Sequence, residues 1–112
     1  MNWERLNSIK ELEVLIEKST ETPQLIFKHS SRCSISSMAF NRLKSGLPAI
    51  GLHIVDVISN REISNLVAQK FDITHQSPQI LIIYNQACIF DTSHFNISSP
   101  IVSKEINLIQ KV

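Results

Sequence analysis

The sequence contains few of the residues and patterns on which nucleotide-binding and zinc-binding proteins depend. Its 112 residues include two glycines, Gly46 and Gly51, so it has no glycine-rich loop to bind a phosphate group. Its two cysteines, Cys33 and Cys88, form no Cys-x-x-Cys pair, and no His-x-x-x-His pair occurs, although these are common zinc-ligand spacings. The residue six positions after Cys33 is Ala39, not the arginine of cysteine phosphatases. The sequence therefore predicts no metal site and no phosphate chemistry.

Charge and hydropathy also exclude several classes of partner. The net charge is +1, which gives no reason to expect nucleic acid or an anionic membrane surface as a partner. No apolar run approaches the roughly 20 residues needed to cross a bilayer. The first 19 residues are charged throughout and lack the apolar core of a signal peptide. We therefore expect a cytoplasmic protein in a reducing compartment, without a structural disulfide.

Size and composition favour one folded domain covering residues 1–112. Apolar residues make up 43% of the chain and charged residues 19%, which is typical of a globular protein. A chain of this length can bury roughly two thirds of the surface that its unfolded form exposes. Neither a disulfide nor a metal ion is needed to stabilise such a domain.

The spacing of apolar residues predicts four helices and four strands. Capping-box patterns at residues 8–11 and 59–62 and the pair Ser99-Pro100 indicate where three of the helices begin. The remaining helix, the second in chain order, is expected at 34–45. The strands are expected at 24–29, 50–57, 79–84 and 87–91, with a turn at Asn85-Gln86 between the last two. The order α-β-α-β-α-β-β-α predicts an α/β fold, a four-stranded mixed sheet with helices on both faces.

Cys33 lies within KHSSRCSISSMAFN, residues 28–41, where the first strand leads into the next helix. Unpaired N–H groups and the partial positive charge of a helix N-terminus stabilise a thiolate, the nucleophilic form of cysteine. Lys28, His29 and Arg32 could add to this positive field, and the hydroxyls of Ser34, Ser36 and Ser37 could donate to the sulfur. Two readings remain open from position alone, a reactive thiol and a cysteine that caps or packs under the helix.

Pro78 stands directly before the apolar strand at 79–84, in the stretch HQSPQ. Proline has no N–H to donate to a neighbouring strand, so it is expected to mark the beginning of this strand. A proline that merely begins a strand would look the same in the sequence.

Together these features resemble a thioredoxin-like fold, and more narrowly the monothiol bacilliredoxins, the YtxJ-like family associated with bacillithiol. The resemblance is carried by four separated motifs and spans nearly the whole chain: FKHSSRCSISSMA, DVISNREISN, HQSPQ and TSHFNI. It implies that Cys33 is the active nucleophile. It also implies that Pro78 follows a cis bond and faces Cys33, and that Ser77 offers backbone groups to the substrate.

Ser36 occupies the position of the second cysteine in a dithiol redox motif, and a serine cannot attack a mixed disulfide. We therefore expect a monothiol cycle in which Cys33 accepts a small thiol from an S-thiolated client protein and a second small thiol releases it. The resemblance implies bacillithiol as this co-substrate, and no tightly bound cofactor is expected. The alternative is a binding module for a small thiol or an iron–sulfur cluster, without turnover; a thioredoxin-like scaffold with no activity is a third hypothesis.

The remaining candidate residues have open alternatives. Cys88 is expected to be a small buried or half-buried hydrophobe rather than a resolving cysteine. His29 and Arg32 could tune the thiolate or bind an anionic carboxylate, although His29 could equally be a strand-end residue. His75 could help form the substrate groove or simply lie in a surface loop, and Asp56 could exchange a proton with the thiol or cap local structure. No role is assigned to His94.

Overall fold

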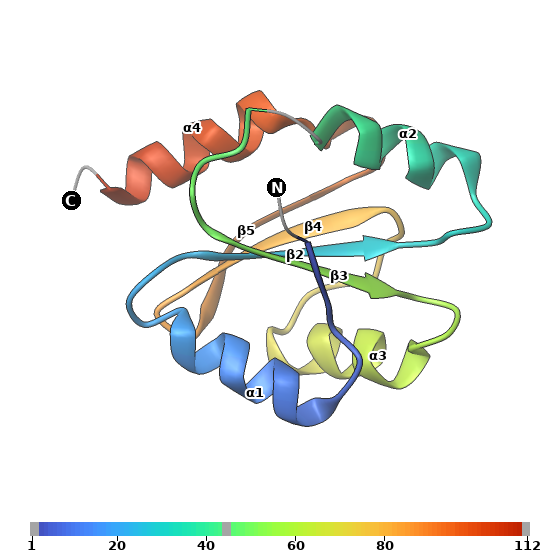
Figure 1. The fold of residues 1–112 in the computed structure, drawn as a ribbon, viewed down its shortest axis with the longest axis horizontal. Helices are drawn as coiled ribbons and strands as arrows, with labels where there is room; N and C mark the ends of the chain where they lie inside the picture. Colours follow the sequence, from blue (N-terminus) through green and yellow to red (C-terminus); the bar gives the residue numbers. More distant parts are fainter. Residues whose placement is uncertain (1–2, 44–45, 111–112) are drawn as a thin grey trace.

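A five-stranded mixed sheet lies between two layers of helices in the computed structural model, which describes residues 3–43 and 46–110 (Figure 1). The strands are β1 (Glu4–Arg5), β2 (Gln24–His29), β3 (Gly51–Asp56), β4 (Gln79–Tyr84) and β5 (Ala87–Ser93), arranged in the order β1-β3-β2-β4-β5. The helices are α1 (Ile9–Lys18), α2 (Ser34–Leu43), α3 (Arg61–Lys70) and α4 (Ser99–Gln110), with a short 3-10 helix, η1 (His94–Asn96). The predicted α/β class, with helices on both faces, is confirmed.

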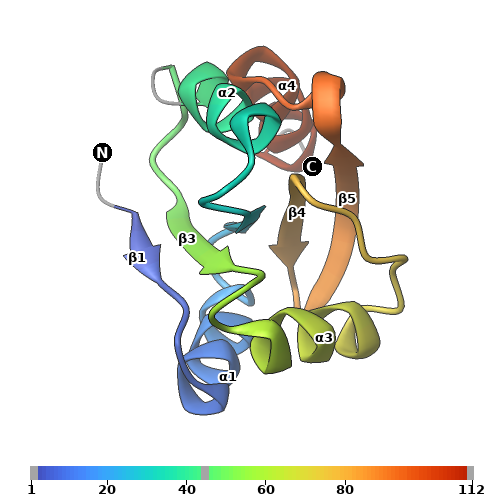
Figure 2. The same ribbon diagram turned by 90° about the vertical axis from the view of Figure 1, so that its right-hand side faces the viewer.

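The prediction of four strands was wrong by one, because β1 was not expected. This strand pairs in parallel with β3, Glu4 opposite His53 and Arg5 opposite Ile54 (Figure 2). It contains two charged, exposed residues at the edge of the sheet. Two residues are too few to show an alternating pattern, so hydropathy carries no signal for this strand.

Helix α1 begins where the sequence predicted, whereas α3 and α4 do not. Ser8 caps α1 by accepting the Glu11 N–H at 3.1 Å, as the predicted capping box requires. The second capping box does not form: Asn60 caps α3, and its side chain makes no capping hydrogen bond to the residues described. Helix α4 begins at Ser99 rather than after it. The expected end of the second helix at Ser45 lies outside the described residues.

Strands β2 and β4 are buried on both faces, which explains the uninterrupted apolar runs at residues 25–27 and 80–83. Helices α2 and α4 cover one face, and α1 and α3 cover the other (Figure 1). The core on the α2–α4 side includes Leu25, Phe27, Leu43, Ile80, Ile82 and Ile106. The core on the opposite side includes Leu12, Leu15, Ile26, Val67, Leu81 and Ile83. Side chains of β2 therefore alternate between the two cores, and this alternation determines which way each residue near Cys33 points.

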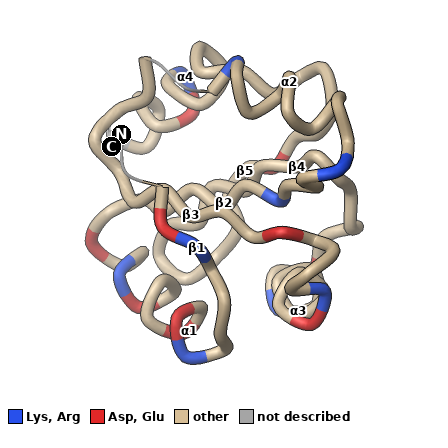
Figure 3. The backbone as a smooth tube through the Cα atoms, turned by 45° about the vertical axis from the view of Figure 1, so that its right-hand side comes forward, with Lys and Arg blue, Asp and Glu red and all other residues tan. Residues whose placement is uncertain are grey.

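Acidic and basic residues are mixed along α1 and α3 (Figure 3). This mixed pattern agrees with the net charge of +1. Among the described residues, no helix is both long and apolar enough to cross a membrane.

Candidate active site

Cys33 is the residue immediately before α2, and it is partly exposed. Its carbonyl accepts the Ser37 N–H at 3.1 Å, the first hydrogen bond of the helix, and its own N–H donates to the Ser30 carbonyl at 3.1 Å. It is thus at the N-cap position of a ten-residue helix. A thiolate here would receive the partial positive charge of the helix N-terminus.

Ser36 lies in the first turn of α2 and is fully buried. Its hydroxyl oxygen accepts the Ser30 N–H at 3.0 Å and is hydrogen-bonded to Nδ1 of His29 at 2.7 Å. The sequence suggested a hydroxyl that could donate to the Cys33 sulfur. The structure instead uses this hydroxyl to connect α2 to the end of β2 and to the loop before Cys33.

His29 is the last residue of β2, half-buried on the α2 side of the sheet. Its ring stacks on Phe27, with centroids 5.5 Å apart, and lies 5.9 Å from the ring of Phe40 on α2. Burial lowers the pKa of His29, and the Arg5 charge acts in the same direction while Asp56 opposes it. Burial thus favours the neutral imidazole, and the hydrogen bond to Ser36 orients the ring beside the start of α2.

The loop that carries Cys33 is also tied to the end of β3. The Ser31 hydroxyl donates to Oδ2 of Asp56 at 2.9 Å, and Oδ1 accepts the N–H groups of Ile58 at 2.8 Å and Ser59 at 3.2 Å. Partial burial acts to raise the pKa of Asp56, but these hydrogen bonds and the nearby His29 outweigh it and hold the pKa below its usual value. Of the two hypotheses for Asp56, the contacts favour the capping role.

Pro78 is buried and follows a cis peptide bond with Ser77, as the resemblance implies. The adjacent residue Gln79 pairs with Lys28 in the antiparallel register of β2 and β4. Pro78 therefore lies at the end of the sheet where β2 finishes and the Cys33 loop begins. Ser77 is half-buried, and its hydroxyl has no hydrogen-bond partner among the residues described.

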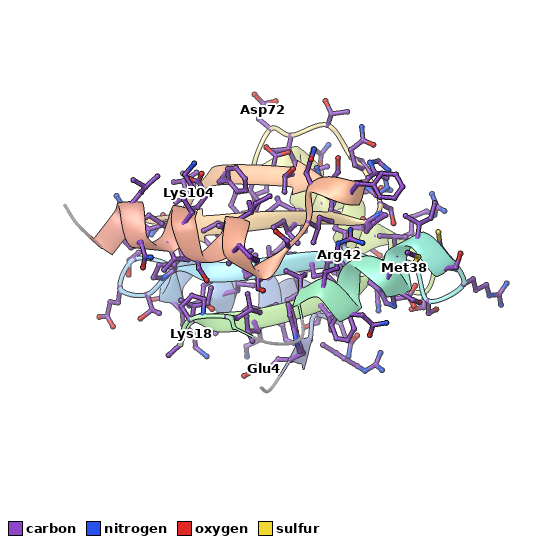
Figure 4. All side chains as sticks on the ribbon, turned by 90° about the horizontal axis from the view of Figure 1, so that it is seen from above. Glu4, Lys18, Met38, Arg42, Asp72 and Lys104 are labelled. Atoms are coloured by element: carbon purple, nitrogen blue, oxygen red, sulfur yellow. The ribbon has the colours of Figure 1, made fainter. Side chains whose placement is uncertain are left out.

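The 3-10 helix η1 connects Pro78 to α2 by hydrogen bonds. The sequence did not predict this connection. The His94 N–H donates to the Pro78 carbonyl at 3.1 Å. Arg42 of α2 (Figure 4) donates through Nη2 to the His94 carbonyl and through Nε to the Ile97 carbonyl, both at 2.8 Å. His94 has a φ of 55°, unusual for a residue other than glycine. The TSHFNI motif thus supports the cis-proline through backbone groups.

The other predicted residues are placed as follows. Arg32 and Ser34 are exposed on either side of Cys33. Lys28 is one residue before His29, so the strand alternation directs it to the opposite face of the sheet from α2. Its amino group hydrogen-bonds to α3 and to His75. The expectation that Lys28 contributes to the field at Cys33 by direct proximity is therefore not supported by its contacts.

Cys88 lies at the far end of the sheet from Cys33. It pairs with Ile83, which pairs with Gln24 at the beginning of β2, whereas the Cys33 loop follows the end of β2. Five residues of strand span about 16 Å, well beyond the reach of a disulfide. The Cys88 thiol donates to the Phe90 carbonyl at 3.4 Å. Cys88 is thus not positioned to resolve a mixed disulfide on Cys33.

The two thiols are expected to differ sharply in alkylation rate. Burial raises the pKa of Cys88 to about 11, so at pH 8 only about one Cys88 thiol in a thousand is ionised and able to react. Brief treatment of the native protein with iodoacetamide should therefore add one carbamidomethyl group, located on Cys33 by peptide mass spectrometry. Denatured protein should take up two. Equal labelling of both cysteines in the native protein would contradict the burial of Cys88.

Among the described residues, no group of three or more His, Cys, Asp or Glu side chains could hold a metal ion. A cavity of about 330 Å³ beside the Cys33 loop is lined in part by His29, Ser31 and Asp56. The site places one thiol at a helix N-terminus, in a loop held by hydrogen bonds to the ends of β2 and β3.

Comparison with known proteins identifies the relatives of this chain. Residues 4–101 match the model of the family described as monothiol bacilliredoxin BrxC. A solved structure described as a candidate oxidoreductase with a thioredoxin fold is 25% identical, with a TM-score of 0.83 and 91% of each chain covered. Thioredoxin from Trypanosoma brucei brucei is 13% identical, with a TM-score of 0.76, covering 99% of this chain and 93% of its own.

Thioredoxin from Malassezia sympodialis is 15% identical, with a TM-score of 0.73, covering 96% of this chain and 90% of its own. These two thioredoxins establish the fold, and the family model, which spans most of the chain, establishes the family. With its single thiol at the start of α2, the chain belongs to the monothiol bacilliredoxin BrxC family and is a thioredoxin-fold thiol-disulfide oxidoreductase.

Proposed function

We propose that this protein removes bacillithiol from S-bacillithiolated client proteins in the cytoplasm, through a mixed disulfide on Cys33. The observation that carries the proposal is the pairing of Cys33 at the N-cap of α2 with a serine, Ser36, three residues later. Membership of the bacilliredoxin family supports bacillithiol as the small thiol. The site supplies one nucleophile, so a co-substrate must complete the cycle.

The first step is attack by the Cys33 thiolate on the bacillithiol sulfur of the client mixed disulfide. The bond between Cys33 and bacillithiol forms as the client disulfide breaks, and the client thiolate leaves and takes a proton from solvent. A second bacillithiol thiolate then attacks the bacillithiol sulfur of this adduct. That step restores the Cys33 thiolate and forms bacillithiol disulfide. In total the client thiol is regenerated, and one free bacillithiol is consumed as it forms a disulfide with the bacillithiol removed from the client.

The surrounding residues have distinct roles in this proposal. Arg32, exposed next to Cys33, offers its guanidinium to carboxylates of the incoming thiol. Ser34 leaves the sulfur accessible at the first position of α2. Ser36 and His29 fix the start of α2 through their shared hydrogen bond. The backbone beside Pro78 aligns the substrate disulfide, with Ser77 as the residue whose backbone groups contact it.

The adduct formed on Cys33 tests the proposal directly. Reduced protein mixed with a peptide that carries a bacillithiol mixed disulfide is expected to gain the mass of one bacillithiol on Cys33 and to lose it when reduced bacillithiol is added. Peptides with glutathione or cysteine in place of bacillithiol serve as controls, and we expect them to react more slowly. Equal rates for all three would contradict bacillithiol specificity. An adduct that reduced bacillithiol does not release would favour the binding-module alternative.

A further inference from the structure

Lys28 is the feature of the site region that the proposed chemistry does not use. Its side chain is 0% exposed, although lysine is rarely buried completely unless it is paired with an acid. Burial lowers the pKa of Lys28 to about 8. An amino group held inside the protein in this way destabilises the fold while it is charged, so its presence one residue before His29 requires an explanation.

The contacts of Lys28 connect three separate segments. From β2, its Nζ donates to the Ser64 carbonyl of α3 at 3.0 Å and hydrogen-bonds to Nδ1 of His75 at 3.1 Å. An ammonium group can only donate, so Nδ1 accepts and the imidazole proton lies on Nε2. Burial and the charges of Lys28 and Arg61 lower the pKa of His75, in agreement with a neutral ring. Both partners of the lysine are thus uncharged acceptors.

His75 belongs to the loop that connects α3 to β4 and ends at the cis bond between Ser77 and Pro78. The side chain of Gln79 holds the same loop from within: its Oε1 accepts the Gln76 N–H at 3.2 Å, and its Nε2 donates to the Thr74 carbonyl at 3.1 Å. Lys28 attaches this loop to β2, the strand that also leads to Cys33. The loop that carries Cys33 and the loop that ends at Pro78 are therefore held relative to each other by the contact between Lys28 and His75.

We propose that Lys28 is a positioning residue for thiol transfer. Its buried amino group, through His75, holds the backbone at Ser77 and Pro78 in the correct position relative to Cys33. This inference rests on the proposed function, because it assigns the loop backbone the task of aligning the substrate disulfide. Lys28 points to the α3 side of the sheet, away from α2. It is therefore expected to affect alignment of the substrate and not the reactivity of Cys33 itself.

His75 is a better residue to substitute than the buried Lys28 when this inference is tested. Its side chain is exposed, so a substitution is not expected to prevent folding. His75→Leu removes the acceptor, whereas His75→Gln keeps one in its amide oxygen. We expect His75→Leu to lower kcat/KM for a bacillithiol mixed-disulfide peptide by roughly tenfold, mainly through a higher KM, because the substrate is held less precisely. His75→Gln should recover activity to within about threefold of wild type.

Alkylation of Cys33 by iodoacetamide provides the matched control, because this small reagent does not require the loop. Its rate should stay within about twofold of wild type in both variants. The double variant Lys28→Met with His75→Leu should be no slower in thiol transfer than Lys28→Met alone, since the two residues act as one unit.

Three results would overturn the inference. They are a His75→Leu variant with wild-type kcat/KM, a parallel fall in the alkylation rate, and fully additive losses in the double variant. These outcomes are distinct from failure of the proposed function, in which the wild-type protein itself does not remove bacillithiol from the peptide.

Discussion

Replacing Cys33 with serine is expected to reduce the removal of bacillithiol from a model mixed disulfide to the uncatalysed background. A serine hydroxyl is not ionised at neutral pH and does not displace a thiolate from a disulfide, so the first step of the cycle is lost. Release of the client peptide thiol, followed by chromatography at several enzyme concentrations, measures the effect. Full activity in the Cys33→Ser protein would refute the assignment of the nucleophile.

Ser36 provides the matched comparison for this variant. Ser36→Ala should retain a substantial rate, because the hydroxyl takes no part in either disulfide exchange. It should nevertheless destabilise the fold by about 1–3 kcal/mol, since the Ser30 N–H and Nδ1 of His29 both lose their partner. Ser36→Cys should instead form a disulfide with Cys33 and expel the bound bacillithiol without a second small thiol, because it restores a Cys-x-x-Cys arrangement.

Much of the fold was predictable because its strands and helices carry strong local patterns. The continuous apolar runs of β2 and β4, together with Pro78 before β4, predicted the centre of the sheet. The alternation of helices and strands predicted the helix layers on both faces. Strand β1 was not predictable, because its pairing with β3 depends on how the chain folds back and not on its two residues.

The position of Cys33 was predictable from the sequence, but the hydrogen bonds that hold the candidate site together were not. Cys33 could be placed at a helix start from the sequence pattern around it, and its location there is confirmed. The role of Ser36 as a link to His29 depends on how α2 packs against β2, which no local pattern records. The His94 N–H donates to the Pro78 carbonyl, and the backbone of His94 is left-handed, a conformation that the residue type does not predict.

Lys28 shows most clearly where sequence reasoning fails. Its proximity to Cys33 along the chain suggested that its charge stabilises the thiolate. Adjacent residues of a strand, however, point to opposite faces of the sheet. The face that Lys28 occupies, and the acceptors it meets there, are determined by α3 and by the loop at His75. A buried lysine with uncharged partners should also have a thermodynamic signature, and this signature can be measured separately from activity.

Lys28→Met is expected to make the protein more stable at pH 7 and to change how its stability depends on pH. The pKa of Lys28 is about 8 in the folded protein, below its usual value of 10.5. Between these two values the unfolded chain binds more protons than the folded one, so the free energy of unfolding of wild type rises with pH. The penalty is fully present below pH 8 and is relieved as the pH approaches 10.5. The gap of about 2.5 units corresponds to up to about 3 kcal/mol.

Urea unfolding at several pH values between 7 and 10.5 measures this difference, with Trp3, the only tryptophan, as the fluorescent reporter. Trp3 packs against Phe27 and Phe40, so its environment changes when the sheet and α2 separate. The advantage of Lys28→Met over wild type should shrink as the pH rises.

Cys88 acts in the opposite direction, because its raised pKa makes the folded state less favourable above pH 9. This effect is present in both proteins, so it cancels when one stability is subtracted from the other. A difference between the two proteins that stays constant from pH 7 to 10.5 would show that Lys28 is not a buried cation. A Lys28→Met variant that is more stable at pH 7 and yet slower in thiol transfer would show that the buried amino group serves alignment of the substrate at the expense of stability.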